Sequence, residues 1–353
     1  NNAIETLSAN DAPFYFRYTL NHFRESDCMD EPTATTILRS IKKLIKNDEI
    51  YDAFVENGFP KLPYGSYSKE VYPILYDLIL NHPDIFGHQA EQTKSNLLKS
   101  FVNDPKKGLS IVGTAAQRYV KRGIPALMTI LDLLKEDKAI ARVKDNQELL
   151  TSYLSIIVYL CQNNDEYREN RLTDLFSVIS QKVLSKDTDK QMLRQIYISL
   201  CYLRDEAKSL GKRKSSQLYF PIDKMISHLS VENAQGPILA LLVERAESNS
   251  SELNNQKLIN KLFSVAEKNN NLKATIVLMK LASTEELARS VFGNGEWLQK
   301  ELPETVDTIR LFLVIFEHTE LRSEIANNPN FIPFLKNIIQ KLNHHWKERP
   351  LGL

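Results

Sequence analysis

The sequence contains little glycine and proline. Only 11 Gly and 14 Pro occur among its 353 residues, and an all-β chain of this length would need many more turn-forming residues. We therefore expect an all-α chain. The sequence also lacks any run of about 18 apolar residues and any basic N-terminal segment followed by an apolar one. These absences predict a soluble, non-secreted chain that does not insert into membranes.

Neither sign of charge dominates, and cysteine is scarce. Lys and Arg total 45 against 44 for Asp and Glu, so the field of the whole molecule does not attract nucleic acid, and we do not expect nucleic acid as a partner. The cysteines Cys28, Cys161 and Cys201 are far apart and odd in number. Two of them lie within apolar helical patterns, which predicts reduced core thiols in a cytoplasmic protein, with the nucleus as the alternative location.

Motifs that carry enzyme chemistry are absent as well. The chain has no glycine-rich phosphate loop, no Gly-x-Ser-x-Gly turn, no His-Glu-x-x-His and no Cys-x-x-Cys. The sequence therefore predicts no catalytic residue, no cofactor and no metal site. Adjacent His344 and His345 do not change this, because two metal ligands on one helix need a spacing of three or four residues. We expect a protein that is not an enzyme.

The chain does contain a helical pattern that recurs along its length. Ile37, Leu38, Ile41 and Leu44 fall on one stripe with the period of an α-helix. Residues 305–342 show the recurring pattern, which is an apolar helix, a short polar helix, an Asn-Pro break and a second apolar helix. Successive long helices end about 32 to 48 residues apart, which is near the period of about 40 residues of known helical repeats. We interpret the chain as one continuous array.

Turn residues divide this pattern into helices. Asn57 and Gly58 are expected to end one helix because both tolerate positive φ, and Pro60 is expected to begin the next. Gly123 is expected to close a short helix, after which Ile124-Pro125 opens a long apolar one. Residues 206–217, EAKSLGKRKSSQ, are expected to form an exposed loop.

Three of these turns resemble the Gly-Ile-Pro-x-Leu opening of the second helix of an armadillo repeat. They are Gly123-Ile124-Pro125-Ala126-Leu127, Gly58-Phe59-Pro60-Lys61-Leu62 and Phe331-Ile332-Pro333-Phe334-Leu335. The resemblance implies a right-handed α-solenoid of about seven to eight armadillo/HEAT-like repeats. We expect residues 1–34 to form an atypical N-terminal cap, residues 35–342 the repeat array and residues 343–353 a C-terminal tail.

The resemblance also implies a concave groove that binds a protein or an extended peptide. Its walls would be the third helices of the repeats, over Thr35–Lys46, Val71–Leu80, Asn146–Cys161, Gln191–Leu203, Gly236–Arg245, Lys273–Leu281 and Thr305–Phe316. Importin-alpha-like members carry a Trp and an Asn four residues apart on these helices. The equivalent pairs here are Arg39/Lys43, Ser155/Tyr159, Ile198/Tyr202 and Leu311/Ile315, so import-cargo recognition is not expected. Tyr159 and Tyr202 would offer an aromatic surface to a partner or pack between repeats.

These observations predict a non-enzymatic scaffold or adaptor that binds a peptide or protein. Two alternatives stay open: a regulatory repeat domain of a larger enzyme such as a kinase, and a HEAT-like array that binds nucleic acid through local basic patches. The chain begins with Asn rather than Met, so we expect further domains in a longer protein. The basic run Lys212–Lys214 beside Ser215 and Ser216 fits a solvated loop, a localisation signal, a nucleic-acid contact or a phosphorylation site.

Overall fold

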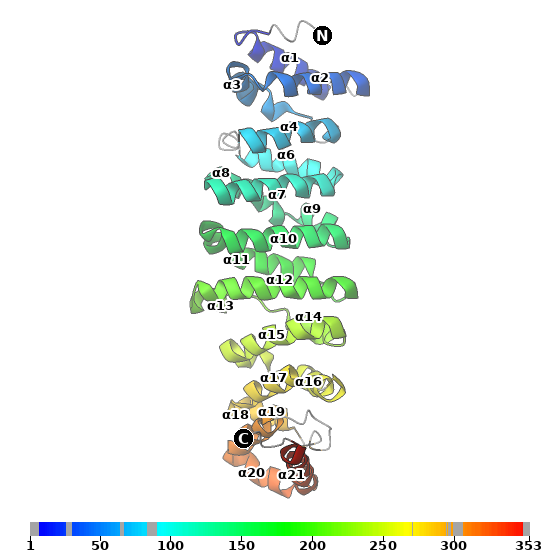
Figure 1. The fold of residues 1–353 in the computed structure, drawn as a ribbon, viewed down its shortest axis with the longest axis vertical. Helices are drawn as coiled ribbons and strands as arrows, with labels where there is room; N and C mark the ends of the chain where they lie inside the picture. The colour runs from blue at the N-terminus through cyan, green and yellow to red at the C-terminus, as the bar shows by residue number, and fades with distance from the viewer. Residues whose placement is uncertain are drawn as a thin grey trace. The chain divides into compact units, whose positions relative to one another are not determined.

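A computed structural model describes residues 7–25, 30–63, 67–82, 90–269, 271–293, 295, 298 and 306–348. All secondary structure in these ranges is helical (Figure 1), which confirms the all-α prediction. The chain divides into two compact units. The first comprises residues 1–183 and 202–211, and the second comprises residues 184–201 and 212–353.

The first unit consists of helices that pack in sequence order. Its elements are α1 (Ala12–Glu25), α2 (Glu31–Leu44), α3 (Asp48–Asn57), α4 (Ser68–Asn81), α6 (Ala90–Asn103), α7 (Pro105–Arg122), α8 (Pro125–Leu131), α9 (Asp137–Val143), α10 (Gln147–Asn163), α11 (Asp165–Val178) and the end of α12 (Lys190–Ser209), with 3-10 turns at Phe59–Lys61 and Asp132–Lys135 and a π-helical turn at Ile179–Val183. Helix α2 packs on α4, α4 on α7 and α7 on α10 (Figure 1), while α6, α8, α9 and α11 pack against these longer helices.

The second unit repeats this arrangement. Its elements are the start of α12, then α13 (Lys212–Ser216), α14 (Ile222–His228), α15 (Glu232–Asn249), a 3-10 turn at Ser250–Leu253, α16 (Gln256–Asn269), α17 (Leu272–Ala282), α18 (Glu285–Phe292), α19 (Val306–Glu317), α20 (Thr319–Asn327) and α21 (Phe331–Glu348). Helix α15 packs on α17 and α17 on α19, and α14, α16 and α18 pack against them.

Asparagine side chains fix where several helices begin. The side-chain oxygens of Asn47, Asn146 and Asn164 accept hydrogen bonds from backbone N–H groups two or three residues later, at 3.0, 3.0 and 2.7 Å. These bonds satisfy N–H groups that the first helical turn leaves without an intrahelical partner. The starts of α3, α10 and α11 are therefore encoded locally in the sequence.

Two turn predictions were wrong in part. Gly123 does end a helix, at a left-handed φ of 60°, but that helix is the 18-residue α7, and the helix that begins at Pro125 has only 7 residues. The long helix precedes the glycine because Leu109, Val112 and Tyr119 form a buried face along α7. The expected short and long helices are thus exchanged.

The turn at Gly58 differs from its prediction for a steric reason. Gly58 ends α3 with φ of −104°, so positive φ is not the cause. A Cβ at this position would lie 2.6 Å from a ring carbon of Phe54, so glycine is required by close approach. Pro60 begins only a 3-10 turn of three residues. Residues 206–217 are likewise no simple loop, since they include the end of α12 and the short helix α13.

Hydrogen bonds in both units join residues about 40 positions apart, near the period of helical repeats. Arg171 bonds to Asp132 across 39 residues, Lys224 to the carbonyl of Leu184 across 40, and His318 to the carbonyl of Ala282 across 36. Each bond joins segments that are far apart in the sequence. Neighbouring groups are therefore linked by polar contacts as well as by their shared apolar core.

Cys161 lies fully buried in this core, and burial raises the pKa of its thiol to about 12. Cys201 is half-buried, and neither of the two forms a disulfide with another described residue. Cys28 and the side chains of His344 and His345 lie outside the described residues. In the part of the chain that the structure describes, no helix is both long and apolar enough to cross a membrane.

Candidate functional site

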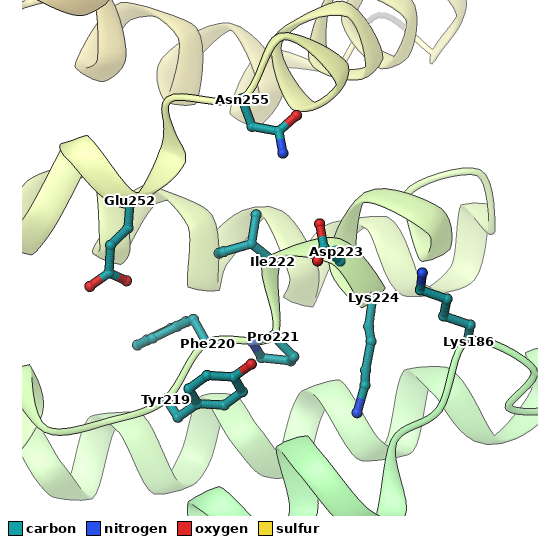
Figure 2. Close-up of a pocket in the computed structure, with 9 residues that line it drawn as sticks. All are labelled: Lys186, Tyr219, Phe220, Pro221, Ile222, Asp223, Lys224, Glu252 and Asn255. Atoms are coloured by element: carbon teal, nitrogen blue, oxygen red, sulfur yellow. The ribbon is translucent and has the colours of Figure 1, made fainter.

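A pocket of about 430 Å³ lies in the second unit, where three separate segments meet (Figure 2). Lys186 comes from the turn before α12, and a second segment supplies Glu252, in the 3-10 turn after α15, and Asn255, directly before α16. The remaining lining residues are consecutive, from Tyr219 to Lys224. The volume lies in the range of pockets that bind small molecules or single side-chain groups.

The extended segment before α14 forms the apolar floor. Leu218 and Phe220 are 2% and 5% exposed, whereas Tyr219 between them is 52% exposed. This alternation is typical of extended backbone, in which successive side chains point to opposite sides. Pro221 ends the segment and directly precedes α14. The backbone thus buries Phe220 while it leaves the ring of Tyr219 at the rim.

Glu252 is held in place by two neighbours. Its carboxylate accepts hydrogen bonds from Arg245, through Nε at 2.8 Å and through a second guanidinium nitrogen, and from Asn249 Nδ2 at 2.7 Å. The Arg245 guanidinium also lies 5.2 Å from the centre of the Phe220 ring. Because the Arg245 side chain is only 7% exposed, one buried cation positions both the acidic wall and the aromatic floor of the pocket.

The side chain of Asn255 caps a helix through its oxygen and directs its amide nitrogen toward the pocket. Its side-chain oxygen accepts hydrogen bonds from the backbone N–H groups of Lys257 and Leu258, at 2.9 and 3.3 Å, and so caps α16. The amide nitrogen is not used by this cap, and Figure 2 shows it pointing toward Ile222. The cap therefore fixes a hydrogen-bond donor above the apolar floor.

Helix α14 holds the turn that carries Lys186. Lys224 Nζ donates to the carbonyl of Leu184 at 2.7 Å, and His228 Nε2 lies 3.2 Å from the carbonyl of Lys186. A carbonyl can only accept, so Nε2 carries the proton and His228 Nδ1 accepts from the Tyr197 hydroxyl at 2.9 Å. Burial lowers the pKa of His228, and the charge of Lys224 lowers it further. Burial also lowers the pKa of Lys224.

The lining of this pocket combines an apolar floor with a charged rim. The floor is apolar, and the exposed rim carries both signs of charge, from Lys186, Asp223 and Glu252, together with the Tyr219 ring. Such a buried apolar centre with a polar rim is typical of protein interfaces. Within the described ranges, no group of three or more His, Cys, Asp or Glu side chains could hold a metal ion.

The residues predicted to line the groove lie on three helices. Arg39 and Lys43 are exposed on α2, and Ser155 is exposed on α10 with Tyr159 half-buried one turn later. On α12, Ile198 is half-buried in the second unit, and Tyr202 is 49% exposed in the first.

Helices α7 and α10 present their outer faces on the same side of the first unit. Lys106 on α7 pairs with Glu148 on α10 at 2.8 Å, and both side chains are exposed. About two turns further along both helices, a Cβ added at Gly113 on α7 would lie 3.4 Å from the Cδ1 atom of Ile156 on α10. The face of α10 that carries Ser155 therefore lies beside an exposed face of α7.

The pair predicted on the last groove helix was wrong. Leu311 and Ile315 are fully buried on α19, while Leu313 is 50% exposed. Arg310 and Glu317 are exposed on one face of this helix, opposite Leu311 and Ile315, so the helical period of its sequence already indicates which face is covered. Sequence reasoning also missed the pocket. The signal in the sequence was the apolar run Tyr219-Phe220-Pro221-Ile222 after a basic segment. A solvent-exposed connection between helices is usually polar, so an apolar run there indicates buried residues.

No protein-family model, curated protein or solved structure matches the chain.

Proposed function

We propose that the protein is a non-enzymatic interaction scaffold or adaptor, in which the pocket of the second unit binds a peptide segment of a partner protein. The observation that carries the proposal is the exposed Tyr219 ring, which lines the pocket next to the buried Phe220 and Pro221. Tyrosine is enriched among the residues that contribute most to binding at protein interfaces. An apolar or aromatic side chain of the peptide would lie on this floor.

The polar groups of the rim suit the backbone of such a peptide. The Asn255 amide and the Lys186 ammonium can donate to peptide carbonyls, and the Asp223 carboxylate can accept from peptide N–H groups. Because the rim contains both cations and anions, a peptide of low net charge fits it better than nucleic acid does. Nucleic acid requires a concentrated basic footprint.

The proposal includes the architecture of an α-solenoid of armadillo/HEAT-like repeats. Hydrogen bonds between residues 36 to 40 positions apart support it, as do the stacked long helices within each unit. A second contact region would be the predicted concave groove, with Arg39, Lys43, Ser155, Tyr159, Ile198 and Tyr202 as its candidate residues. We propose a cytoplasmic location, with the nucleus as the alternative, and Cys161 and Cys201, which are not in disulfides, support a reducing compartment.

Selection from a random-peptide display library on the full chain tests the proposal. We expect recovered peptides to share an apolar or aromatic residue and to lose affinity by about thirtyfold with Tyr219→Ala, the loss that follows from removing a binding residue worth about 2 kcal/mol. Tyr76→Ala is the matched control, because Tyr76 is 44% exposed in the first unit and remote in sequence from the pocket.

Two further variants distinguish binding in the pocket from binding in the predicted groove. If Tyr219→Ala leaves affinity unchanged and Tyr159→Ala and Tyr202→Ala reduce it, the binding site is the predicted groove and the pocket assignment is wrong. If no peptide is enriched over a blank support, peptide binding itself is refuted.

A further inference from the structure

The basic segment between α12 and α14 carries two serines that the peptide-binding proposal does not use. Lys212, Arg213 and Lys214 are followed by Ser215 and Ser216, and all five residues form the short helix α13. The side chains of Lys212, Arg213 and Ser216 are exposed. Among the described residues, no ion pair engages Lys212 or Arg213. A charged, accessible sequence next to a hydroxyl is therefore presented to solvent.

We propose that Ser216 is a phosphorylation site for a kinase that selects basic substrates. Arg213 lies three residues before Ser216, with Lys214 and Lys212 on either side of it. In an extended substrate, three residues span about 10 Å, so carboxylates of the kinase beside its catalytic centre can bind Arg213 while the Ser216 hydroxyl meets ATP. Selection of substrates by complementary charge is a general property of kinases.

The fold permits the local opening that a kinase needs. Gly211, directly before α13, has a φ of 106°, and Leu218 and Phe220, after it, are buried. A helix of 5 residues is far below the length at which isolated helices are stable in water. Because α13 contains no buried residue, its opening uncovers no apolar side chain.

The reaction at Ser216 is an ordinary phosphoryl transfer. The Ser216 Oγ attacks the γ-phosphorus of ATP, and a new O–P bond forms as the bond to the bridging oxygen breaks. ADP leaves with that electron pair, and the hydroxyl proton passes to a carboxylate base of the kinase. The product can no longer donate the hydrogen bond from Ser216 Oγ to the Arg213 carbonyl, which is 2.9 Å long.

Phosphorylation would weaken α13. The phosphate adds nearly two negative charges at the C-terminal end of the helix, where anions are unfavourable. The lost Ser216 hydrogen bond acts in the same direction. We expect faster amide hydrogen exchange over residues 212–217 after modification. This inference does not depend on peptide binding by the pocket.

Incubation of the full chain with MgATP and a basophilic kinase of the cyclic-AMP-dependent type tests the proposal, with the modified residue located by tandem mass spectrometry. We expect phosphate on Ser216, its loss with Ser216→Ala, and a rate about tenfold lower with Arg213→Ala, because a charge-assisted contact to the kinase is removed. Ser215→Ala and Arg194→Ala, an exposed arginine elsewhere in the same unit, should change the rate by less than about twofold.

Three results would overturn the proposal. They are an unmodified Ser216 in folded protein, modification of Ser215 in place of Ser216, and a rate that Arg213→Ala leaves unchanged. Circular dichroism of each variant shows whether it is folded. Because Arg213 and Ser216 are both exposed, their substitution should leave the helical signal of the chain intact.

Discussion

Arg245 is the buried cation that connects Glu252 to Phe220, and its replacement measures how the pocket is held together. Arg245→Met keeps an apolar stem but removes the guanidinium. It removes an ion pair whose Glu252 side chain is 45% exposed, worth about 0.5–1 kcal/mol after solvent screening, and a ring contact worth about 0.5–1 kcal/mol. We expect a loss of about 1–2 kcal/mol in the stability of the second unit.

Arg245→Ala should cost more because it also removes the buried stem. Two or three methylene groups at about 0.8 kcal/mol each raise the expected loss to about 3–4 kcal/mol. The comparison of the two variants therefore separates packing of the stem from the interactions of the guanidinium group.

Unfolding in urea, monitored by the hydrogen exchange of peptides from α14–α16, measures the loss of stability in the second unit alone. A double-mutant cycle of Arg245→Met with Glu252→Gln should give a coupling energy of about 0.5–1 kcal/mol. A coupling near zero would refute the assignment of Arg245 as the group that positions Glu252. Equal losses for Arg245→Met and Arg245→Ala would refute the packing argument.

The remaining predictions concern pH and two glycines. The lowered pKa of buried His228 means that the unfolded chain binds more protons below about pH 6.5, so stability is complete above that pH and falls as pH decreases through it. Urea midpoints at about pH 7.5 and about pH 5.5 check this, and His228→Gln should remove that part of the pH dependence. Gly123→Ala should cost about 1–2 kcal/mol in the first unit, because φ is 60° and only backbone strain opposes the methyl group. Gly113→Ala inside α7 would place the new methyl group 3.4 Å from Ile156, an ordinary contact, and should stabilise the first unit by about 0.5–1 kcal/mol. Thermal unfolding of both glycine variants measures these changes in stability. A change of the same sign in the two variants would contradict the prediction.

Much of the secondary structure could be predicted from the sequence because the signals are local. The asparagines at 47, 146 and 164 place helix starts through their own side-chain hydrogen bonds. Gly293, with φ of 56°, ends α18 in the same local way. The lengths of the helices before and after Gly123 could not be predicted from that residue. The glycine marks the boundary between two helices, but it does not show which of them buries more apolar side chains and is therefore longer.

The sequence by itself determined that the chain is helical, where several helices begin, and which face of an amphipathic helix is apolar. Only the tertiary structure decided how long the helices on either side of Gly123 are and which distant segments meet. The pocket brings together Lys186, Tyr219 and Asn255. Hydrogen bonds from Lys224 to the Leu184 carbonyl and from His228 to the Lys186 carbonyl, across 40 and 42 residues, hold one side of it. Such pairings depend on packing between helices, which local propensity does not encode.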